Sequence, residues 1–170
     1  MRVAYADPPY IGCAHLYPEK EEVDHVALIE KLKTYDAWAL SATSNSLHTI
    51  LPLCSDTVRI MAWVKPFCIF KPSVRTAYAW EPVLVQQGRL RTKDQDTVRD
   101  WVSANITLRR GVVGAKPDQF CYWLFEVLNL SPEDEFDDLF PGSGAVTRAW
   151  NHYKRSMAFR PEQFELEFAV

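Results

Sequence analysis

The sequence has no hydrophobic run that approaches the roughly 20 residues needed to cross a bilayer. Its start, Met1 to Asp7, lacks the long apolar stretch of a signal peptide. The four cysteines, at positions 13, 54, 68 and 121, show no Cys-x-x-Cys spacing, which fits neither a disulfide framework nor a zinc site. We therefore expect a soluble, unexported protein of the reducing cytoplasm, with no membrane partner and no metal.

Internal repeats, low-complexity segments and Gly/Ser linkers are also missing. The 170 residues are 48% hydrophobic and 24% charged, so the chain can bury a sizeable core. This composition excludes disordered, fibrous and coiled-coil proteins. We expect one domain that spans residues 1–170.

Positive charge is concentrated in one segment. Residues 65–116 contain ten lysines and arginines against four acidic residues, whereas the rest of the chain has nine basic and eighteen acidic residues. Clustered cations suit a nucleic-acid backbone, because they release its counterions. A solvated surface loop is the alternative.

Short apolar runs alternate with helical patterns along the chain. We predict strands at residues 3–6, 37–41, 58–64, 79–85 and 136–140, and helices at 24–33, 46–53, 117–130 and 145–153. Pro82 predicts an edge position or a bulge for its strand. Further short strands are predicted near 106–108 and at 164–168. This alternation is typical of βαβ units and a mostly parallel sheet with helices on both faces.

The first motif is Asp7-Pro8-Pro9-Tyr10, directly after the first predicted strand. Two consecutive prolines remove two N–H donors and present rigid carbonyl acceptors. Asp7 and the Pro8 carbonyl can accept the two hydrogens of an amino group on a flat ring, while Tyr10 stacks on that ring. The alternative is a plain turn at the end of a strand.

The second motif is Asp138-Leu139-Phe140-Pro141-Gly142-Ser143-Gly144, at a turn from strand to helix. Gly142 and Gly144 let the backbone pass close to a ligand, and the amides at the helix start can bind a carboxylate. The motif lacks the third glycine of the dinucleotide fingerprint and the Gly-Lys-Ser/Thr of a P-loop. A helix-entry turn without a ligand is the alternative. Because both motifs follow predicted parallel strands, we expect them to meet at one edge of the sheet.

Asp7-Pro8-Pro9-Tyr10 resembles the catalytic motif of amino methyltransferases that use S-adenosylmethionine (SAM) to methylate adenine N6, and residues 138–144 resemble their cofactor loop. Trp80-Glu81-Pro82-Val83-Leu84-Val85 and Gly114-Ala115-Lys116-Pro117 are similar to two intermediate elements of the family. With the catalytic motif first and the cofactor loop last, the order resembles that of the permuted, beta-type DNA methyltransferases.

The resemblance implies a Rossmann-like methyltransferase fold with a catalytic half at 1–86, a basic loop region at 87–114 and a cofactor-binding half at 115–170. It implies that Asp7, Pro8, Pro9 and Tyr10 form the catalytic site. The implied SAM-binding residues are Asp7, Lys116, Asp138, Phe140, Gly142, Ser143 and Gly144.

The basic segment supplies the expected contacts to nucleic acid. We predict that its two ends flank the mouth of the site, with phosphate contacts from Arg89, Arg91, Lys93, Arg109 and Arg110. DNA is the expected substrate. The alternative is RNA, methylated at adenosine N6 by the same reaction. A non-catalytic nucleic-acid-binding subunit is the alternative of another class.

Family members continue past the cofactor loop to an acidic residue that binds the cofactor ribose, for which Glu162, Glu165 and Glu167 are candidates here. A separate target-recognition domain is missing, so specificity would come from the basic loop, a homodimer or a separate subunit.

Overall fold

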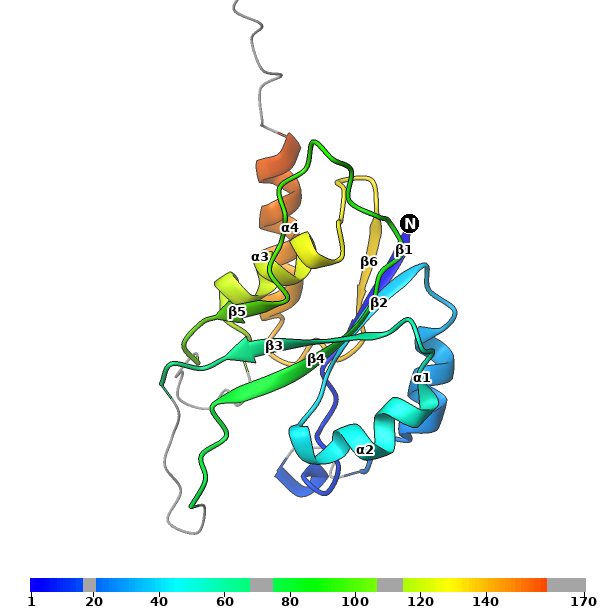
Figure 1. Ribbon diagram of the computed structural model, residues 1–170, viewed down its shortest axis with the longest axis vertical. Coiled ribbons are helices and arrows are strands. Elements are labelled where there is room, and N and C mark those ends of the chain that lie inside the picture. Colours follow the sequence, from blue (N-terminus) through cyan, green and yellow to red (C-terminus); the bar gives the residue numbers. More distant parts are fainter. Residues whose placement is uncertain (17–20, 68–74, 107–114, 159–170) are drawn as a thin grey trace, which may run out of the picture.

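The computed structural model describes residues 1–16, 21–67, 75–106 and 115–158. Its centre is a six-stranded sheet with the order β5-β3-β4-β2-β1-β6 (Figure 1). Every strand runs in the same direction except β4, which is antiparallel to both of its neighbours. The strands are β1 Arg2–Ala6, β2 Ala37–Ser41, β3 Arg59–Val64, β4 Trp80–Gln86, β5 Trp101–Ser103 and β6 Glu135–Asp138.

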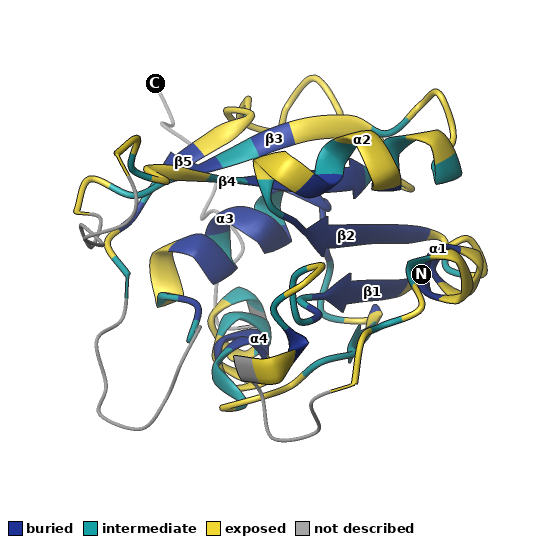
Figure 2. Cartoon of the chain, turned by 90° about the horizontal axis from the view of Figure 1, so that it is seen from below, coloured by how far each residue is buried: buried dark blue, intermediate teal, exposed yellow. Residues whose placement is uncertain are grey.

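Helices cover both faces of the sheet. Alternate residues of a strand point to opposite faces, and in β1 Val3 and Tyr5 join the core under α3 and α4, while Ala4 and Ala6 join the core under α1 and α2. Figure 2 shows β1 and β2 as buried strands. The helices are α1 His25–Leu32, α2 Leu47–Ile50, α3 Asp118–Val127 and α4 Ala145–Ala158, and short 3-10 turns span Ala14–Leu16, Ser44–Ser46 and Leu51–Leu53. The predicted α/β fold with a mostly parallel sheet is thus confirmed.

Local sequence accounts for most helix boundaries. Asp24 accepts hydrogen bonds from the Val26 and Ala27 N–H groups and caps α1, as its residue type predicts. α3 begins directly after Pro117 and buries six of its ten residues, which explains why its sequence is apolar on nearly every side. None of the described helices is both long and apolar enough to cross a membrane.

The edge position or bulge predicted for the strand that contains Pro82 is wrong. β4 lies in the middle of the sheet. Pro82 is tolerated there because it lies opposite Ala42, just past the end of β2, so its missing N–H removes only the last hydrogen bond of the β2–β4 ladder. The Pro82 carbonyl still accepts from the Ala42 N–H at 3.0 Å. The basic region contains the strand β5 at Trp101–Ser103, which was not predicted. Of the strand predicted near 106–108, Ile106 lies outside any strand, and residues 107 and 108 lie outside the described residues. The predicted strand at 164–168 lies outside the described residues.

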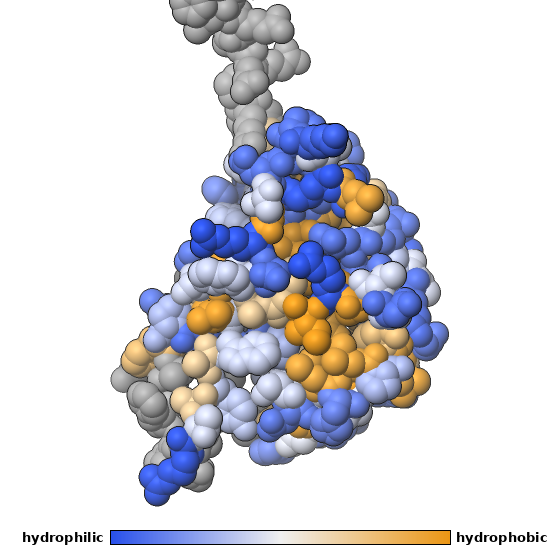
Figure 3. Space-filling model, viewed as in Figure 1, coloured by the Kyte–Doolittle hydropathy of each residue, from blue (hydrophilic) through white to orange (hydrophobic). Residues whose placement is uncertain are grey.

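One part of the sheet keeps apolar side chains in solvent. Ile60 of β3 and Trp80 of β4 are 46% and 42% exposed. Figure 3 shows hydrophobic side chains gathered near the middle of the face seen in Figure 1, with hydrophilic ones around them.

Candidate functional site

The carboxyl ends of the parallel strands bring together charged side chains and a glycine-containing loop from distant parts of the chain. Asp7 follows β1, Lys65 follows β3, and residues 139–144 follow β6. Because β4 is antiparallel, its first residues lie at the same edge, which adds Glu81. In an open α/β sheet this is the edge at which ligands bind.

Lys116, which lies just before α3, forms one ion cluster with Asp7, Glu81 and Lys65. The Lys116 Nζ lies 2.8 Å from each carboxylate oxygen of Asp7 and 3.7 Å from Glu81 Oε2. Lys65 pairs with the other oxygen of Glu81. The Lys116 side chain is only 4% exposed, and those of Lys65 and Glu81 are 13% exposed. The cluster thus contains two positive and two negative charges in a largely buried place, where the Asp7 side chain is the most exposed, at 20%.

Aromatic rings surround the cluster. The Trp63 ring lies 4.7 Å from Lys65 Nζ and 5.4 Å from Lys116 Nζ, and the Phe120 ring lies 5.9 Å from Lys116 Nζ. The faces of aromatic rings attract cations. The rings therefore add to the attraction that keeps both ammonium groups in place.

The two carboxylates of the cluster differ in basicity. Burial raises the pKa of Asp7, although Lys116 opposes the shift, and the negative charge of Glu81 raises it further. Burial also acts to raise the pKa of Glu81, but the charges of Lys116 and Lys65 and hydrogen bonds from Lys65 and Tyr10 outweigh it, so its pKa is lowered. The pKa of Asp7 is therefore raised and that of Glu81 lowered, although both carboxylates belong to one ion cluster.

The loop after β6 approaches this cluster through its backbone. The Leu139 N–H donates to the Tyr5 carbonyl at 2.9 Å and extends the β1–β6 pairing up to the loop. Gly142 and Gly144 then adopt positive φ values of +45° and +71°, which L residues rarely take. Arg148 in the first turn of α4 donates to the Ser143 carbonyl at 2.7 Å and holds the loop against the helix.

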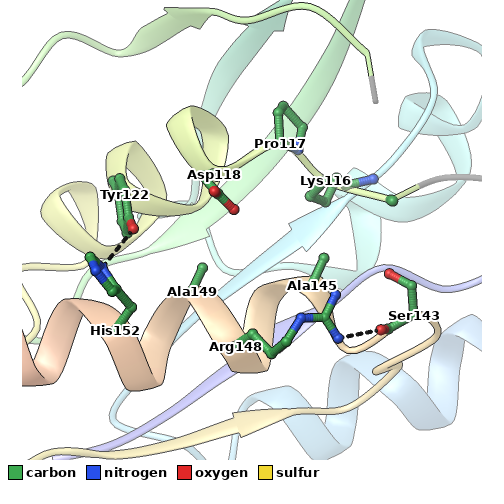
Figure 4. Close-up of a pocket in the computed structure, with 10 residues that line it drawn as sticks. Lys116, Pro117, Asp118, Tyr122, Ser143, Ala145, Arg148, Ala149 and His152 are labelled. Carbon is green, nitrogen blue, oxygen red and sulfur yellow. Dashed lines mark hydrogen bonds between the residues drawn. The ribbon is translucent and has the colours of Figure 1, made fainter. Parts of the chain in front are cut away.

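Two adjoining hollows lie beside the loop and Lys116. The smaller, about 70 Å³, is lined by Asp7, Phe140 and Gly142 among others. The larger, about 790 Å³, lies between α3 and α4 (Figure 4). Both are lined by Ala115, Lys116, Ser143 and Ala145, so together they make one site next to Asp7. The structure thus confirms that the two sequence motifs meet.

Asp138 offers an acceptor at the start of the loop. Its Oδ2 accepts from the Thr147 hydroxyl at 3.0 Å, whereas its Oδ1 is buried without a hydrogen-bond partner among the described residues. Burial raises the pKa of Asp138 even though hydrogen bonds from Thr147 and the Phe140 backbone hold it down, and the charge of Asp7 adds to the rise. A cationic or hydrogen-bond-donating ligand would offset this cost.

The prediction that Arg89 and Arg91 flank the mouth of the site is wrong. β4 ends at the opposite edge of the sheet, so the segment after it starts at the amino ends of the parallel strands. Arg89 there donates to both carboxylate oxygens of Asp134, which also pairs with the amino group of Met1. Arg91 pairs with Glu126 at 3.1 Å. Neither arginine flanks the mouth of the site.

Of the other residues predicted to contact nucleic acid, one is described by the structure and two are not. Lys93 is exposed in the same segment as Arg91. Arg109 and Arg110 lie outside the described residues, as do Glu162, Glu165 and Glu167. The predicted phosphate contacts of Arg109 and Arg110 therefore stay a prediction.

The structure adds residues that were not predicted for the site. Glu81 was noted only as part of a strand, and Lys65 and Trp63 were not singled out. A charged residue directly after an apolar strand, as in Trp63-Val64-Lys65, is the one available sequence signal. Among the described residues, no group of three or more His, Cys, Asp and Glu side chains could hold a metal ion.

The sequence matches no family model and no curated protein. The fold is similar to that of M1.HpyAVI in a crystal structure of its complex with SAM, with a TM-score of 0.59 at 14% identity, covering 90% of this chain and 78% of that one. A second crystal structure of M1.HpyAVI gives a TM-score of 0.55 at 13% identity, covering 90% of this chain and 76% of the other. These comparisons show a shared fold.

Proposed function

We propose that this protein transfers a methyl group from SAM to the exocyclic N6 amine of adenine in DNA. The observation that carries the proposal is that Asp7, Gly142 and Ser143 line one hollow. One motif suits an amino group and the other suits a ligand that approaches the backbone, and the reaction requires both partners side by side. The SAM complex of M1.HpyAVI, which has a similar fold, supports this choice of cofactor.

The site has features that fit SAM. Gly142 lines the smaller hollow without a side chain, and Asp138, at the start of the loop, has a buried Oδ1 with no hydrogen-bond partner among the described residues. The residues proposed to hold SAM are Asp7, Lys116, Asp138, Phe140, Gly142, Ser143 and Gly144. When bound, SAM would supply an electrophilic methyl group, so that a nitrogen–carbon bond forms as the carbon–sulfur bond breaks, S-adenosylhomocysteine leaves and one amine proton passes to solvent.

The catalytic residues proposed for the target amine are Asp7, Pro8, Pro9 and Tyr10. Asp7 and the Pro8 carbonyl accept the two N–H hydrogens and so direct the nitrogen lone pair toward the methyl group. A carboxylate has about four acceptor positions, so Asp7 can keep Lys116 and still accept from the amine. Tyr10 supplies the aromatic face for the base. Alignment and preorganised acceptors then account for most of the rate enhancement.

The experiment is calorimetric titration of the protein with SAM, followed by incubation with DNA or RNA and mass spectrometry of the digested nucleosides. We expect SAM to bind and N6-methyldeoxyadenosine to form. Methyladenosine in RNA alone would replace the DNA assignment. SAM binding without any methylated nucleoside would favour the non-catalytic subunit, and the absence of SAM binding would overturn the proposal.

A further inference from the structure

α4 carries positive charge without any acidic residue. Its fourteen residues include Arg148, Lys154 and Arg155, and no Asp or Glu. This differs from the chain as a whole, which has a net charge of −3. The positive charge is therefore a local property of this helix.

The arginines lie on the solvent side of α4. Val146, Ala149 and Trp150 are buried in the core, whereas Arg148, Asn151, His152 and Arg155 are exposed. Residues three, four and seven apart share one side of a helix, so these four exposed residues form a stripe, here called the α4 basic face. At 1.5 Å per residue, its two arginines are about 10 Å apart along the helix axis.

No carboxylate of a described residue neutralises these two arginines. Arg148 and Arg155 donate to the backbone carbonyls of Ser143 and Asn151, at 2.7 and 3.0 Å. Four other described arginines do pair with carboxylates, namely Arg2, Arg59, Arg89 and Arg91, whereas Arg99 lies over the Trp101 ring and Arg75 is exposed. Positive charge is thus available to an outside partner on α4.

The α4 basic face begins at the proposed site. Arg148 and His152 line the larger hollow together with Lys116 (Figure 4). Asp118 is the one acid among the described lining residues. The stripe therefore runs from the mouth of the site along the rim of the groove between α3 and α4.

We propose that the α4 basic face binds the phosphate backbone of the DNA that flanks the target base. Phosphates are charged, repeat along the strand and accept hydrogen bonds from guanidinium groups, which matches two unneutralised arginines in line with an amide and an imidazole. The choice of DNA rests on the proposed function. The assignment also replaces Arg89 and Arg91, which the structure ties to carboxylates at the other edge of the sheet.

The experiment is fluorescence anisotropy with a labelled DNA duplex at several salt concentrations, without cofactor. Each phosphate contact contributes about 0.9 to the slope of log affinity against log salt. The variant Arg148→Gln/Arg155→Gln should therefore reduce the slope by about 1.8. The matched control is Arg2→Gln/Arg59→Gln, which removes the same charge from exposed arginines at the amino ends of β1 and β3 and should leave the slope unchanged.

Three outcomes would overturn the inference. The first is an unchanged salt slope in an Arg148→Gln/Arg155→Gln variant with a native circular dichroism spectrum. The second is an equal reduction of the slope in the control variant. The third is that RNA or an acidic peptide competes with the labelled duplex more than tenfold better than unlabelled DNA does. Failure of the proposed function is measured separately, because DNA binding with the expected slopes but no methylated nucleoside would contradict catalysis and leave the α4 assignment intact.

Discussion

Lys116 Nζ lies 2.8 Å from Asp7 Oδ1, although 109 residues separate the two in sequence. One residue comes from the first strand-end motif and the other from the entry to α3. Their ion pair joins the proposed base-binding motif to the hollow proposed for the cofactor. Under the proposed function, Asp7 must keep its charge at a place where burial raises its pKa.

Removal of Asp7 should affect turnover more than cofactor binding. Asp7→Ala deletes an acceptor for the target amine, and loss of one positioned group of this kind costs about 100-fold in rate, ~3 kcal/mol. We expect kcat to fall by that factor, with a smaller change in the SAM affinity measured by calorimetry. Asp56→Ala, in an exposed turn before β3, is the control. A variant at Asp7 that turns over at the parent rate would remove its catalytic role.

The pH dependence of methyl transfer should report on the Asp7–Lys116 pair. Asp7 must be ionised to accept a hydrogen bond from the amine, so the rate should fall as pH falls through its raised pKa. Lys116 lowers that pKa, and Lys116→Met should therefore move the acid limb of kcat to higher pH. Lys65 acts more weakly on Asp7, so Lys65→Met should move the limb less. Identical profiles in the parent and Lys116→Met would contradict this role.

The glycine loop should decide cofactor affinity. Gly142→Val places a branched side chain at a φ of +45° in the lining of the smaller hollow, so SAM binding should be lost in a protein that still folds. Gly12→Val is the matched control, since Gly12 also has a positive φ, of +78°, with open space around it. Unchanged SAM affinity in folded Gly142→Val, or an equal loss in the control, would argue against cofactor binding by this loop.

Asp134 should contribute to stability. Its side chain is 1% exposed and pairs with Arg89 and the amino terminus. Asp134→Asn should lower the free energy of unfolding by about 2 kcal/mol, less than for a fully buried pair because Arg89 is 38% exposed. Glu133→Gln, an exposed neighbour, should change it by less than about 0.5 kcal/mol.

The same pair gives a pH signature. Burial acts to raise the pKa of Asp134, but hydrogen bonds from Arg89, the amino terminus and the Ser131 N–H outweigh it, so the folded-state pKa is lowered. The stabilisation is therefore present above the ordinary pKa of aspartate and is lost as pH falls from that value through the folded one. Urea unfolding of the parent and Asp134→Asn should show a difference that shrinks across that acidic range. A difference independent of pH would exclude the ion pair as its cause.

Much of the architecture could be predicted from local patterns. The alternation of apolar runs and helical periods located β1, β2, β3 and α3 close to their observed bounds. The rule that parallel strands end at one edge correctly brought Asp7 and Gly142 together. Glu81 and Lys65 were missed as members of the site because a charged residue at a strand end has the same local pattern whether it faces solvent or an opposite charge.

By itself the sequence determined most of the strands and helices and the two motifs, because side-chain periodicity, proline and glycine act on neighbouring residues. Only the tertiary structure decided the direction and the neighbours of β4. That antiparallel pairing carried Glu81 to the carboxyl edge, next to Lys116, and sent Arg89 to the amino edge, against Asp134. A strand pattern is the same in either direction, and its direction depends on hydrogen bonds to strands elsewhere in the chain.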